Sequence, residues 1–341
     1  MPIPIPIPFP PMEAKRVEKI PPAGRWQFEP KWDGFRAIIF RHDDEVYIQS
    51  KAGLPLTRYF PELVAAFLQL EQKTFVLDGE IVISIAGSLS FDDLQLRLHP
   101  AKSRVEKLSK ETPAQYFAFD LLYRPVSGLK GKDIHELPVQ DRRAELEEFF
   151  ESVPAASPMK LSPATTDRNA AVEWFENYGS MGLDGIIGKL LDEPYHSGDR
   201  EGMIKVKHLK EADCVVGGFR YGTGTKSIST LLLGLYDDEG VLNHIGHCSS
   251  FNEKERKELT KKLLPLAGRG GFTGSSPGGP SRWSTERSSD WTAVEPTLVC
   301  EVRYDYFSQG RFRHGSKFLR WRSDKNPEAC TYDQVSTKRK R

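Results

Sequence analysis

The chain has 341 residues and a formal net charge of +1, with 48 Lys and Arg against 47 Asp and Glu. This length favours two soluble domains, and the near-zero charge argues against a protein that coats nucleic acid without specificity. The four cysteines form no C-x-x-C pair, which argues against a zinc knuckle or a disulfide framework, and no apolar run has the length of a transmembrane helix. We therefore expect a cytoplasmic protein that does not enter a membrane.

The first ten residues alternate proline with apolar side chains. Proline lacks a backbone N–H and fixes φ, so this tract should be extended or polyproline II. We expect it to lie on the surface as a tail rather than to serve a proline-binding module, and we assign residues 1–24 to this N-terminal segment.

Residues 26 to about 207 mix the two periodicities of helices and strands. The helix expected at residues 61–70 begins with Pro61, and Leu63, Val64, Phe67 and Leu68 share one of its faces. Strands are expected at residues 35–40, 46–49, 75–83, 116–122 and 185–189, and further helices at residues 139–150 and 170–178.

After the charged segment 207–213 the pattern changes to short β-rich runs. Strands are expected at residues 214–219, 231–236, 244–248, 298–306 and 318–321, with a helix at residues 253–264. Five short strands and one helix suit a small Greek-key barrel of the OB type. Residues 268–281, rich in Gly, Ser and Pro, should form a mobile loop, and the basic residues 338–341 are either a solvated tail or a source of phosphate contacts.

The most informative motif is Glu29-Pro-Lys31-Trp-Asp-Gly-Phe-Arg36. A lysine followed by Asp-Gly and then arginine can carry a nucleotide covalently if its amine attacks the α-phosphate. Lys, Asp and Gly are also common in turns, so the motif by itself leaves an ordinary charged turn open.

Carboxylates interrupt two runs that are otherwise typical of buried strands. Asp78-Gly-Glu80 lies within such a strand, and a buried carboxylate there usually faces a metal, a ribose hydroxyl or a cation. Phe119, followed by an acid, could stack on a base, although a buried phenylalanine is more often part of a core. Asp184-Gly and Lys189 flank a third apolar strand, and Lys189 requires an anion if it is buried.

Two basic groups complete the set of candidate residues. Lys205 and Lys207 have the spacing that puts both on one face of a strand, where they could meet one phosphate or simply remain solvated. The run Arg320-Trp-Arg322-Ser-Asp324-Lys325 could bind an anion or protect an exposed barrel edge.

In their order, these motifs resemble the six collinear motifs of the covalent nucleotidyltransferases. The likeness covers residues 26–325 and is strongest to the small bacterial ATP-dependent DNA ligases, namely ligase C and the ligase module of ligase D. It implies an α+β protein, with an antiparallel-sheet, ATP-grasp-like adenylyltransferase domain at residues 25–210, an OB-fold β-barrel domain at residues 211–330 and a basic tail at residues 331–341.

The resemblance also implies roles for individual residues. Lys31 would be the catalytic nucleophile, Glu80 and Asp184 would bind metal, and the residues implied in ATP binding are Glu29, Arg36, Lys51, Glu80, Phe119, Lys189, Arg200, Lys205, Lys207, Arg320, Arg322, Asp324 and Lys325. Two positions depart from the family pattern. Lys51 replaces an arginine and lacks its bidentate fork, and Asp184 stands where the family usually has a longer glutamate.

The reaction implied is the sealing of 5′-phosphate/3′-hydroxyl nicks in double-stranded DNA through lysyl-AMP, with ATP as co-substrate and Mg²⁺ or Mn²⁺. An NAD-dependent ligase would need a nicotinamide-recognition module, for which the thirty residues before Lys31 leave no room. RNA ligation, GTP-dependent RNA capping and a non-catalytic OB-fold nucleic-acid-binding protein remain open. The family further implies a monomer near the bacterial nucleoid, with a repair polymerase, a primase or end-joining factors as possible partners.

Overall fold

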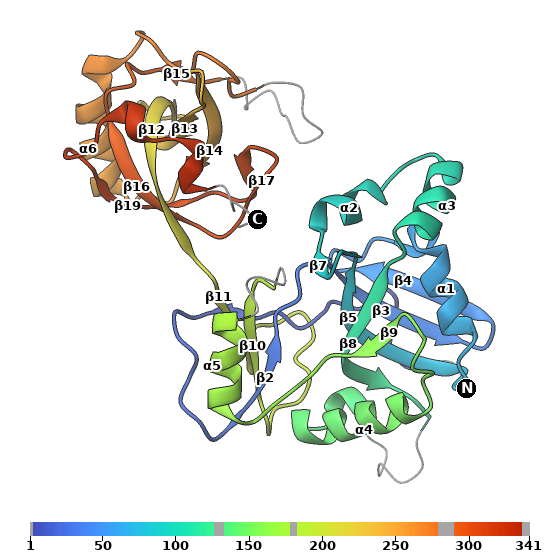
Figure 1. Cartoon of the computed structure of the whole chain (residues 1–341). Helices are drawn as coiled ribbons and strands as arrows, with labels where there is room; N and C mark the ends of the chain where they lie inside the picture. Colours follow the sequence, from blue (N-terminus) through green and yellow to red (C-terminus); the bar gives the residue numbers. More distant parts are fainter. Residues whose placement is uncertain (1–2, 126–132, 178–182, 279–289, 336–341) are drawn as a thin grey trace. The chain divides into compact units, whose positions relative to one another are not determined.

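The computed structural model describes residues 3–125, 133–177, 183–278 and 290–335 of the chain. The chain forms two compact units, Met1–His208 and Leu209–Arg341 (Figure 1). The predicted basic tail at residues 338–341 lies outside the described residues, as does part of the predicted loop at residues 268–281. Among the described residues, no helix has the length and apolar character needed to cross a bilayer.

The first unit contains two main sheets. A five-stranded sheet has the order β4-β3-β5-β8-β9, and a four-stranded sheet has the order β1-β11-β10-β2. Neighbouring strands are antiparallel except β8 with β9 and β1 with β11. The strands are β1 (Lys15–Arg16), β2 (Trp26–Pro30), β3 (Phe35–His42), β4 (Glu45–Ser50), β5 (Thr74–Val82), β8 (Gln115–Tyr123), β9 (Met159–Leu161), β10 (Gly185–Leu190) and β11 (Met203–Lys207), with a small hairpin of β6 (Ser84–Ile85) and β7 (Ser88–Leu89).

Helices pack against both sheets (Figure 1). The helices α1 (Pro61–Leu68), α4 (Val139–Glu151) and α5 (Arg168–Asn177) fall where the sequence predicts them. The helices α2 (Phe91–Leu96) and α3 (Lys102–Glu111) were not predicted, because α2 is short and the polar α3 buries only Val105 and Ser109. Strand β2, which ends just before Lys31, was also missed.

The N-terminal segment is extended, as predicted, but it is more than a surface tail. Ile5, Phe9 and Met12 are 5%, 8% and 0% exposed. Their side chains pack in one cluster with residues of β3, β5 and β8, including Ile38 and Val76. The prolines prevent regular strand pairing, while the apolar residues between them fill the sheet face.

The second unit has the topology of an OB fold. Its strands are β12 (Lys210–Tyr221), β13 (Ile228–Tyr236), β14 (Leu242–Cys248), β15 (Thr292–Ala293), β16 (Val299–Tyr304) and β19 (Lys317–Trp321), with a separate hairpin of β17 (Phe307–Ser308) and β18 (Arg311–Phe312). The sheet order is β14-β13-β12-β16-β19, and α6 (Glu253–Leu263) lies between β14 and β16 in the chain. Among the described residues, strand pairing does not close the sheet into a complete barrel. A parallel bridge from Cys248, at the end of β14, to Ser316, just before β19, links the two edges of the sheet. This is the strand order expected of the five-stranded, partly open OB barrel.

Short 3-10 helices connect several of these elements. They are η1 (Thr57–Tyr59), η2 (Ile134–Glu136), η4 (Leu264–Leu266), η5 (Pro327–Ala329) and η6 (Tyr332–Gln334). Regular strand begins again at Lys210, so within the charged segment 207–213 only two residues lie between β11 and β12.

Candidate active site

Lys31 follows the last residue of β2 and is fixed by its backbone. Its N–H donates to the Gly185 carbonyl at 2.9 Å, and the Asp184 N–H donates to the Lys31 carbonyl at 3.0 Å. The Lys31 ammonium Nζ then lies 2.5 Å from Asp184 Oδ2, and Lys207 Nζ lies 3.1 Å from the same oxygen. Two ammonium groups from distant motifs therefore meet at one carboxylate oxygen of a third motif.

The glycines of the first and third Asp-Gly motifs, Gly34 and Gly185, are required by close packing. A Cβ on Gly34 would lie 2.1 Å from the Ile81 carbonyl oxygen, and one on Gly185 would lie 2.0 Å from the Val206 carbonyl oxygen. Gly185 also has a φ of +136°, which disfavours other residues. These glycines let β3 approach β5 and β10 approach β11, and so place the acids and lysines around Lys31.

A buried ion cluster lies on β2, β8 and β10. Lys189 Nζ is 2.9 Å from Glu29 Oε1 and 3.4 Å from Asp120 Oδ2, and the three side chains are 2%, 2% and 4% exposed. Gln27 donates to Glu29 at 2.7 Å, and Arg142 from α4 holds Asp120 through two hydrogen bonds of 2.7 and 3.1 Å. The buried lysine thus has the anions that the sequence argument required.

Phe119 stands next to this cluster because of a β-bulge. The register of β5 with β8 passes from Asp78 opposite Asp120 to Gly79 opposite Ala118, which leaves Phe119 as the extra residue. A bulge re-aims the side chains around it. The Phe119 ring centroid lies 5.0 Å from Lys189 Nζ and 5.0 Å from the Arg36 guanidinium carbon.

Arg36 is held by a carboxylate that the sequence analysis did not assign to the site. It donates to both oxygens of Asp78 at 2.8 and 2.6 Å, and Tyr195 also donates to Asp78, at 2.5 Å. Burial opposes the charge of Arg36, yet the Asp78 carboxylate raises the pKa of Arg36 well above its ordinary value. Asp78 is therefore the anchor of Arg36.

Glu80 lies two residues after Asp78 on β5, and the causes of its pKa shift differ from those for Arg36. Burial raises the pKa of Glu80 to about 7, although the charges of Lys31 and Arg36 act in the opposite direction. This carboxyl group can change its charge near neutral pH, which suits a residue that meets a cation only when ligands are bound.

The remaining predicted cations of the first unit lie near β11. Burial lowers the pKa of Lys205, and the charges of Lys31, Lys207 and Lys51 lower it further. Lys51 Nζ lies 3.0 Å from Glu13, and Arg200 lies 3.1 Å from the same side chain. Positive charge therefore accumulates around Lys31, as anion binding requires.

The predicted basic run of the second unit forms a cluster of its own. Arg322 contacts Asp213 at 2.9 Å and Asp324 at 2.8 Å, and Lys325 lies 3.6 Å from Asp213. The hydrogen bond from Arg322 lowers the pKa of Asp324 to about 2. Arg320 is paired instead with Glu301 on β16, at 2.6 Å.

Comparison with known proteins decides the family. Residues 11–207 match the model of the ATP dependent DNA ligase domain, and residues 224–325 match that of the ATP dependent DNA ligase C terminal region. The chain belongs to the ATP-dependent DNA ligases. It is 42% identical to DNA ligase C1 of Mycolicibacterium smegmatis, over 99% of this chain and 96% of that protein.

Two further comparisons agree with this family. The ligase is 32% identical to the multifunctional non-homologous end joining DNA repair protein LigD of Mycobacterium tuberculosis, over 89% of this chain but 37% of that larger protein. A solved Lig E DNA ligase covers 92% of this chain at 19% identity with a TM-score of 0.57, and supports the fold.

Sequence reasoning missed several residues of the ligase that hold the predicted ones. Asp78 holds Arg36 directly, while Tyr195 contacts Asp78 and Arg142 contacts Asp120, through pairings that span between 22 and 117 positions of the chain. Trp32 stacks on Phe117 with ring centroids 3.8 Å apart, which anchors the loop after Lys31. The buried-looking strand around Asp78 was the one available signal, since an acid there requires a cation.

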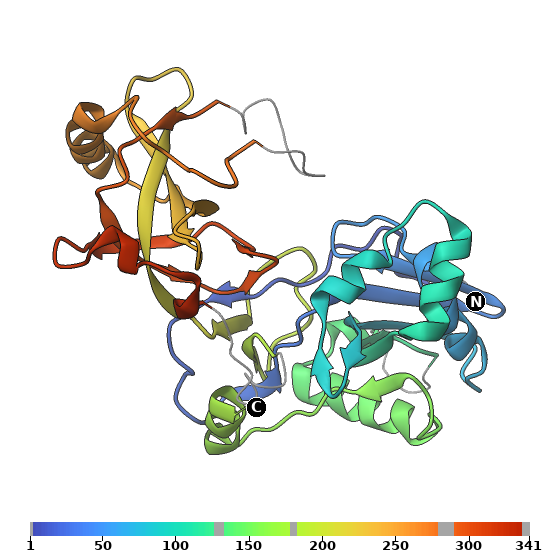
Figure 2. The same ribbon diagram turned by 45° about the horizontal axis from the view of Figure 1, so that its top comes forward.

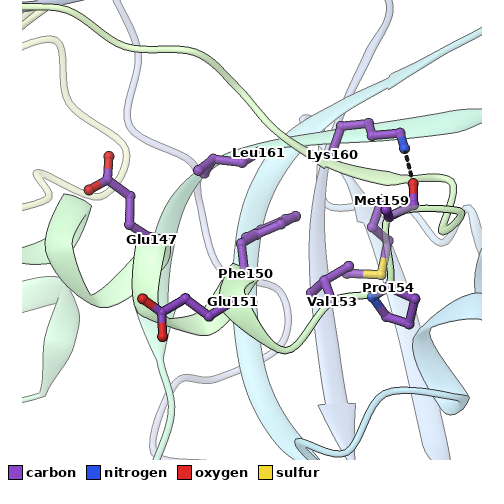
Figure 3. A pocket seen from close by; sticks show the side chains of 9 residues that line it. Glu147, Phe150, Glu151, Val153, Pro154, Met159, Lys160 and Leu161 are labelled. Carbon is purple, nitrogen blue, oxygen red and sulfur yellow. Dashed lines mark hydrogen bonds between the residues drawn. The ribbon is translucent and has the colours of Figure 1, made fainter.

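A cavity of about 400 Å³ lies in another part of the same unit, and Figure 3 shows the side chains that line it. It lies between the end of α4 and β9, where Phe150, Met159 and Leu161 form apolar walls and Glu147 and Glu151 lie at the edge. None of its lining residues belongs to the predicted nucleotide site. The cavity is therefore separate from the chemistry around Lys31.

Proposed function

We propose that this ligase seals nicks in double-stranded DNA with ATP and that Lys31 is its nucleophile. The observation that carries the proposal is the position of Lys31 Nζ, 2.5 Å from an Asp184 oxygen that also contacts Lys207. Asp184 orients the amine and can accept its proton, while the surrounding lysines attract the phosphates of ATP.

Three phosphoryl transfers would complete the reaction. The Lys31 amine forms a bond to the α-phosphorus of ATP, and the bond to the β-phosphate oxygen breaks and releases pyrophosphate. An oxygen of the DNA 5′-phosphate then attacks the same phosphorus and frees Lys31. Finally the 3′-hydroxyl oxygen attacks the 5′-phosphorus and AMP leaves. Such transfers depend on positioning and charge neutralisation, which the cationic site supplies.

The buried ion cluster supports a site for adenine on β2, β8 and β10. Glu29, fixed by Lys189, would recognise the polar edge of the base, and the Phe119 ring would stack on its face. Arg36 and Glu80 would meet the ribose, while Lys205 and Lys207 would hold the α-phosphate. Lys51 and Arg200 lie further along the same basic region and would contact the outer phosphates.

The carboxylates of the site suit Mg²⁺ or Mn²⁺, since oxygen donors are what these hard cations prefer. Asp184 and Glu80 would hold the ion, which would neutralise phosphate charge. Among the described residues no three His, Cys, Asp or Glu side chains are grouped so as to cage a metal. This fits a cation that shares its coordination with substrate phosphates and water.

The OB unit would contribute Arg320, Arg322, Asp324 and Lys325 to the first step only. These groups would orient the pyrophosphate leaving group when the unit closes on ATP, with the short connection after Lys207 as the hinge. The same unit would then turn another face towards DNA. The relative named for non-homologous end joining favours a role in DNA repair, with recruitment by a polymerase or an end-joining factor.

A labelling experiment tests the proposed function. The protein is incubated with a divalent cation and α-labelled ATP or GTP, and then with nicked duplexes whose 3′ strand ends in DNA or RNA. We expect an acid-labile label from ATP and sealing of the DNA nick, both lost in Lys31→Ala. Undiminished labelling of Lys31→Ala would overturn the assignment, whereas labelling by GTP, or sealing only of RNA, would favour the capping or RNA-ligase alternatives.

A further inference from the structure

The N-terminal segment connects the two sheets of the first unit. Figures 1 and 2 show it running from the five-stranded sheet to the four-stranded one. At its start, the Phe9 N–H donates to Gln49 Oε1 at 2.8 Å and Gln49 Nε2 donates to the Phe9 carbonyl at 2.7 Å, which fixes the segment to β4. At its end, β1 pairs with β11. Between these ends, the Pro10 carbonyl accepts a hydrogen bond from Ser197 at 2.7 Å, and three further contacts lead to residues of the site or to the groups that hold them.

One of these contacts is a chain of hydrogen bonds that leads to Arg36. The Met12 N–H donates to the Tyr195 hydroxyl oxygen at 2.9 Å, and that hydroxyl donates to Asp78 at 2.5 Å. Asp78 in turn holds the Arg36 guanidinium through two bonds. A hydroxyl has one hydrogen to donate, so the Met12 N–H orients the Tyr195 hydroxyl towards the carboxylate. Asp78 and Met12 are both 0% exposed, so water does not replace either partner.

A second contact is made by β1 with the strand that carries Lys205. Arg16 is opposite Lys205 in parallel register, and the Val17 N–H donates to the Lys205 carbonyl at 3.0 Å. Without β1, strand β11 would be the edge strand of the four-stranded sheet on this side. The segment therefore fixes the backbone from which Lys205 projects.

Glu13 provides the third contact. Its carboxylate lies 3.0 Å from Lys51 Nζ and 3.1 Å from Arg200, and its own N–H donates to the Asp199 carbonyl at 2.7 Å. The hydrogen bond from Lys51 lowers the pKa of Glu13, so this carboxylate is charged at neutral pH. It holds two predicted phosphate-binding cations in one place.

We propose that residues 3–17 form a strap that positions Arg36 and Lys205 for the nucleotide, and that the Tyr195 hydroxyl is the positioning group between the strap and Arg36. This inference rests on the proposed nucleotide site. A segment that served only to cover apolar surface would be held by Ile5, Phe9 and Met12 alone. Here the backbone also contacts the Tyr195 hydroxyl and the Lys205 carbonyl, and the Glu13 carboxylate contacts Lys51 and Arg200.

The test is the substitution Tyr195→Phe, which removes the hydroxyl and keeps the ring that packs on Phe9. The KM for ATP in the formation of the protein–AMP adduct should rise about tenfold, the size expected for a hydrogen bond to a charged group, while kcat changes less than about twofold. Tyr47→Phe is the matched control, because Tyr47 packs on the same cluster and its hydroxyl has no hydrogen bond within the described part of the chain. It should leave both constants unchanged.

A further variant, which keeps the buried apolar residues of the strap, makes the result decisive if Tyr195→Phe does not fold. Glu13→Gln should raise KM by about threefold, since exposed ion pairs are weak. An unchanged KM in the variants that fold would overturn the strap. Absence of any adduct in the wild-type protein would instead contradict the proposed function.

Discussion

Lys189 in the first unit and Arg322 in the second each hold two carboxylates, but in very different surroundings. Lys189 and its partners Glu29 and Asp120 are at most 4% exposed. Arg322 is 18% exposed, and its partners Asp213 and Asp324 are 12% and 65% exposed. A buried pair loses much free energy when one partner is removed, whereas exposed pairs exchange readily with water and other ions.

This difference in burial fits the function proposed for each ion cluster. The base and ribose must be held in one geometry through several transfers, and a buried, fully paired cluster provides that. The leaving group must be bound once and then released, so its cations need partners that a phosphate can displace. The largely buried Asp213 keeps Arg322 oriented, while a phosphate can displace the exposed Asp324.

The largest effect should follow from removing the buried cation. Lys189→Met leaves Glu29 and Asp120 buried without their partner, so the free energy of unfolding should fall by about 3–5 kcal/mol, with loss of adduct formation. Chemical denaturation measures this change. Lys102→Met, at a side chain that is 91% exposed, is the control and should cost less than about 0.5 kcal/mol. An equally small cost for Lys189→Met would remove the contrast between the two clusters.

A selective kinetic effect should follow from the exposed cluster. Arg322→Ala should slow the formation of the protein–AMP adduct about 100-fold, because a preorganised charge at the leaving group is lost. Sealing of a nick that already carries AMP should change little. Arg303→Ala, another ion-paired arginine of the same unit, should affect neither step. Equal loss of both steps in Arg322→Ala would show that the residue does not act on the leaving group.

The smallest effect is a pH dependence at Glu80. Its pKa is about 7 in the folded protein against an ordinary 4.5, so the folded state retains a proton that the unfolded chain releases. The stabilising contribution is complete below about pH 4.5 and is lost as the pH rises through 7. Between pH 5 and pH 8 the free energy of unfolding should fall by about 1–3 kcal/mol relative to that of Glu80→Gln.

The matched control for this pH dependence is Glu106→Gln, at a side chain that is 55% exposed. Its unfolding free energy should follow that of the wild-type protein at every pH. Parallel curves for the wild-type protein and Glu80→Gln would contradict the raised pKa.

Much of the fold follows from local patterns, while the contacts that hold the site do not. The amphipathic pattern of α1, the five runs of the OB unit and the apolar runs of β5 and β8 are local properties, and all were predicted. The polar helix α3 and the three residues of β9 carry too little apolar pattern to be recognised. Helix and strand periodicity is weak wherever tertiary packing, rather than local sequence, stabilises the element.

The predicted site residues were found from their order in the chain, not from their partners. Lys31, Asp184 and Lys207 belong to three motifs, and the structure brings them to one oxygen atom. Tyr195 lies in a loop without any periodic pattern, and its contact with Asp78 spans 117 positions. Such a pairing depends on how the sheets are connected, which a single sequence does not reveal.

The most direct test of the account is to locate the AMP by mass spectrometry. The protein is incubated with ATP and a divalent cation, digested without acid and searched for peptides that carry one added AMP. The account predicts a single modified peptide that contains Lys31, and no modification in Lys31→Arg. AMP on Lys205 or Lys207, or on several lysines at once, would contradict Lys31 as the nucleophile.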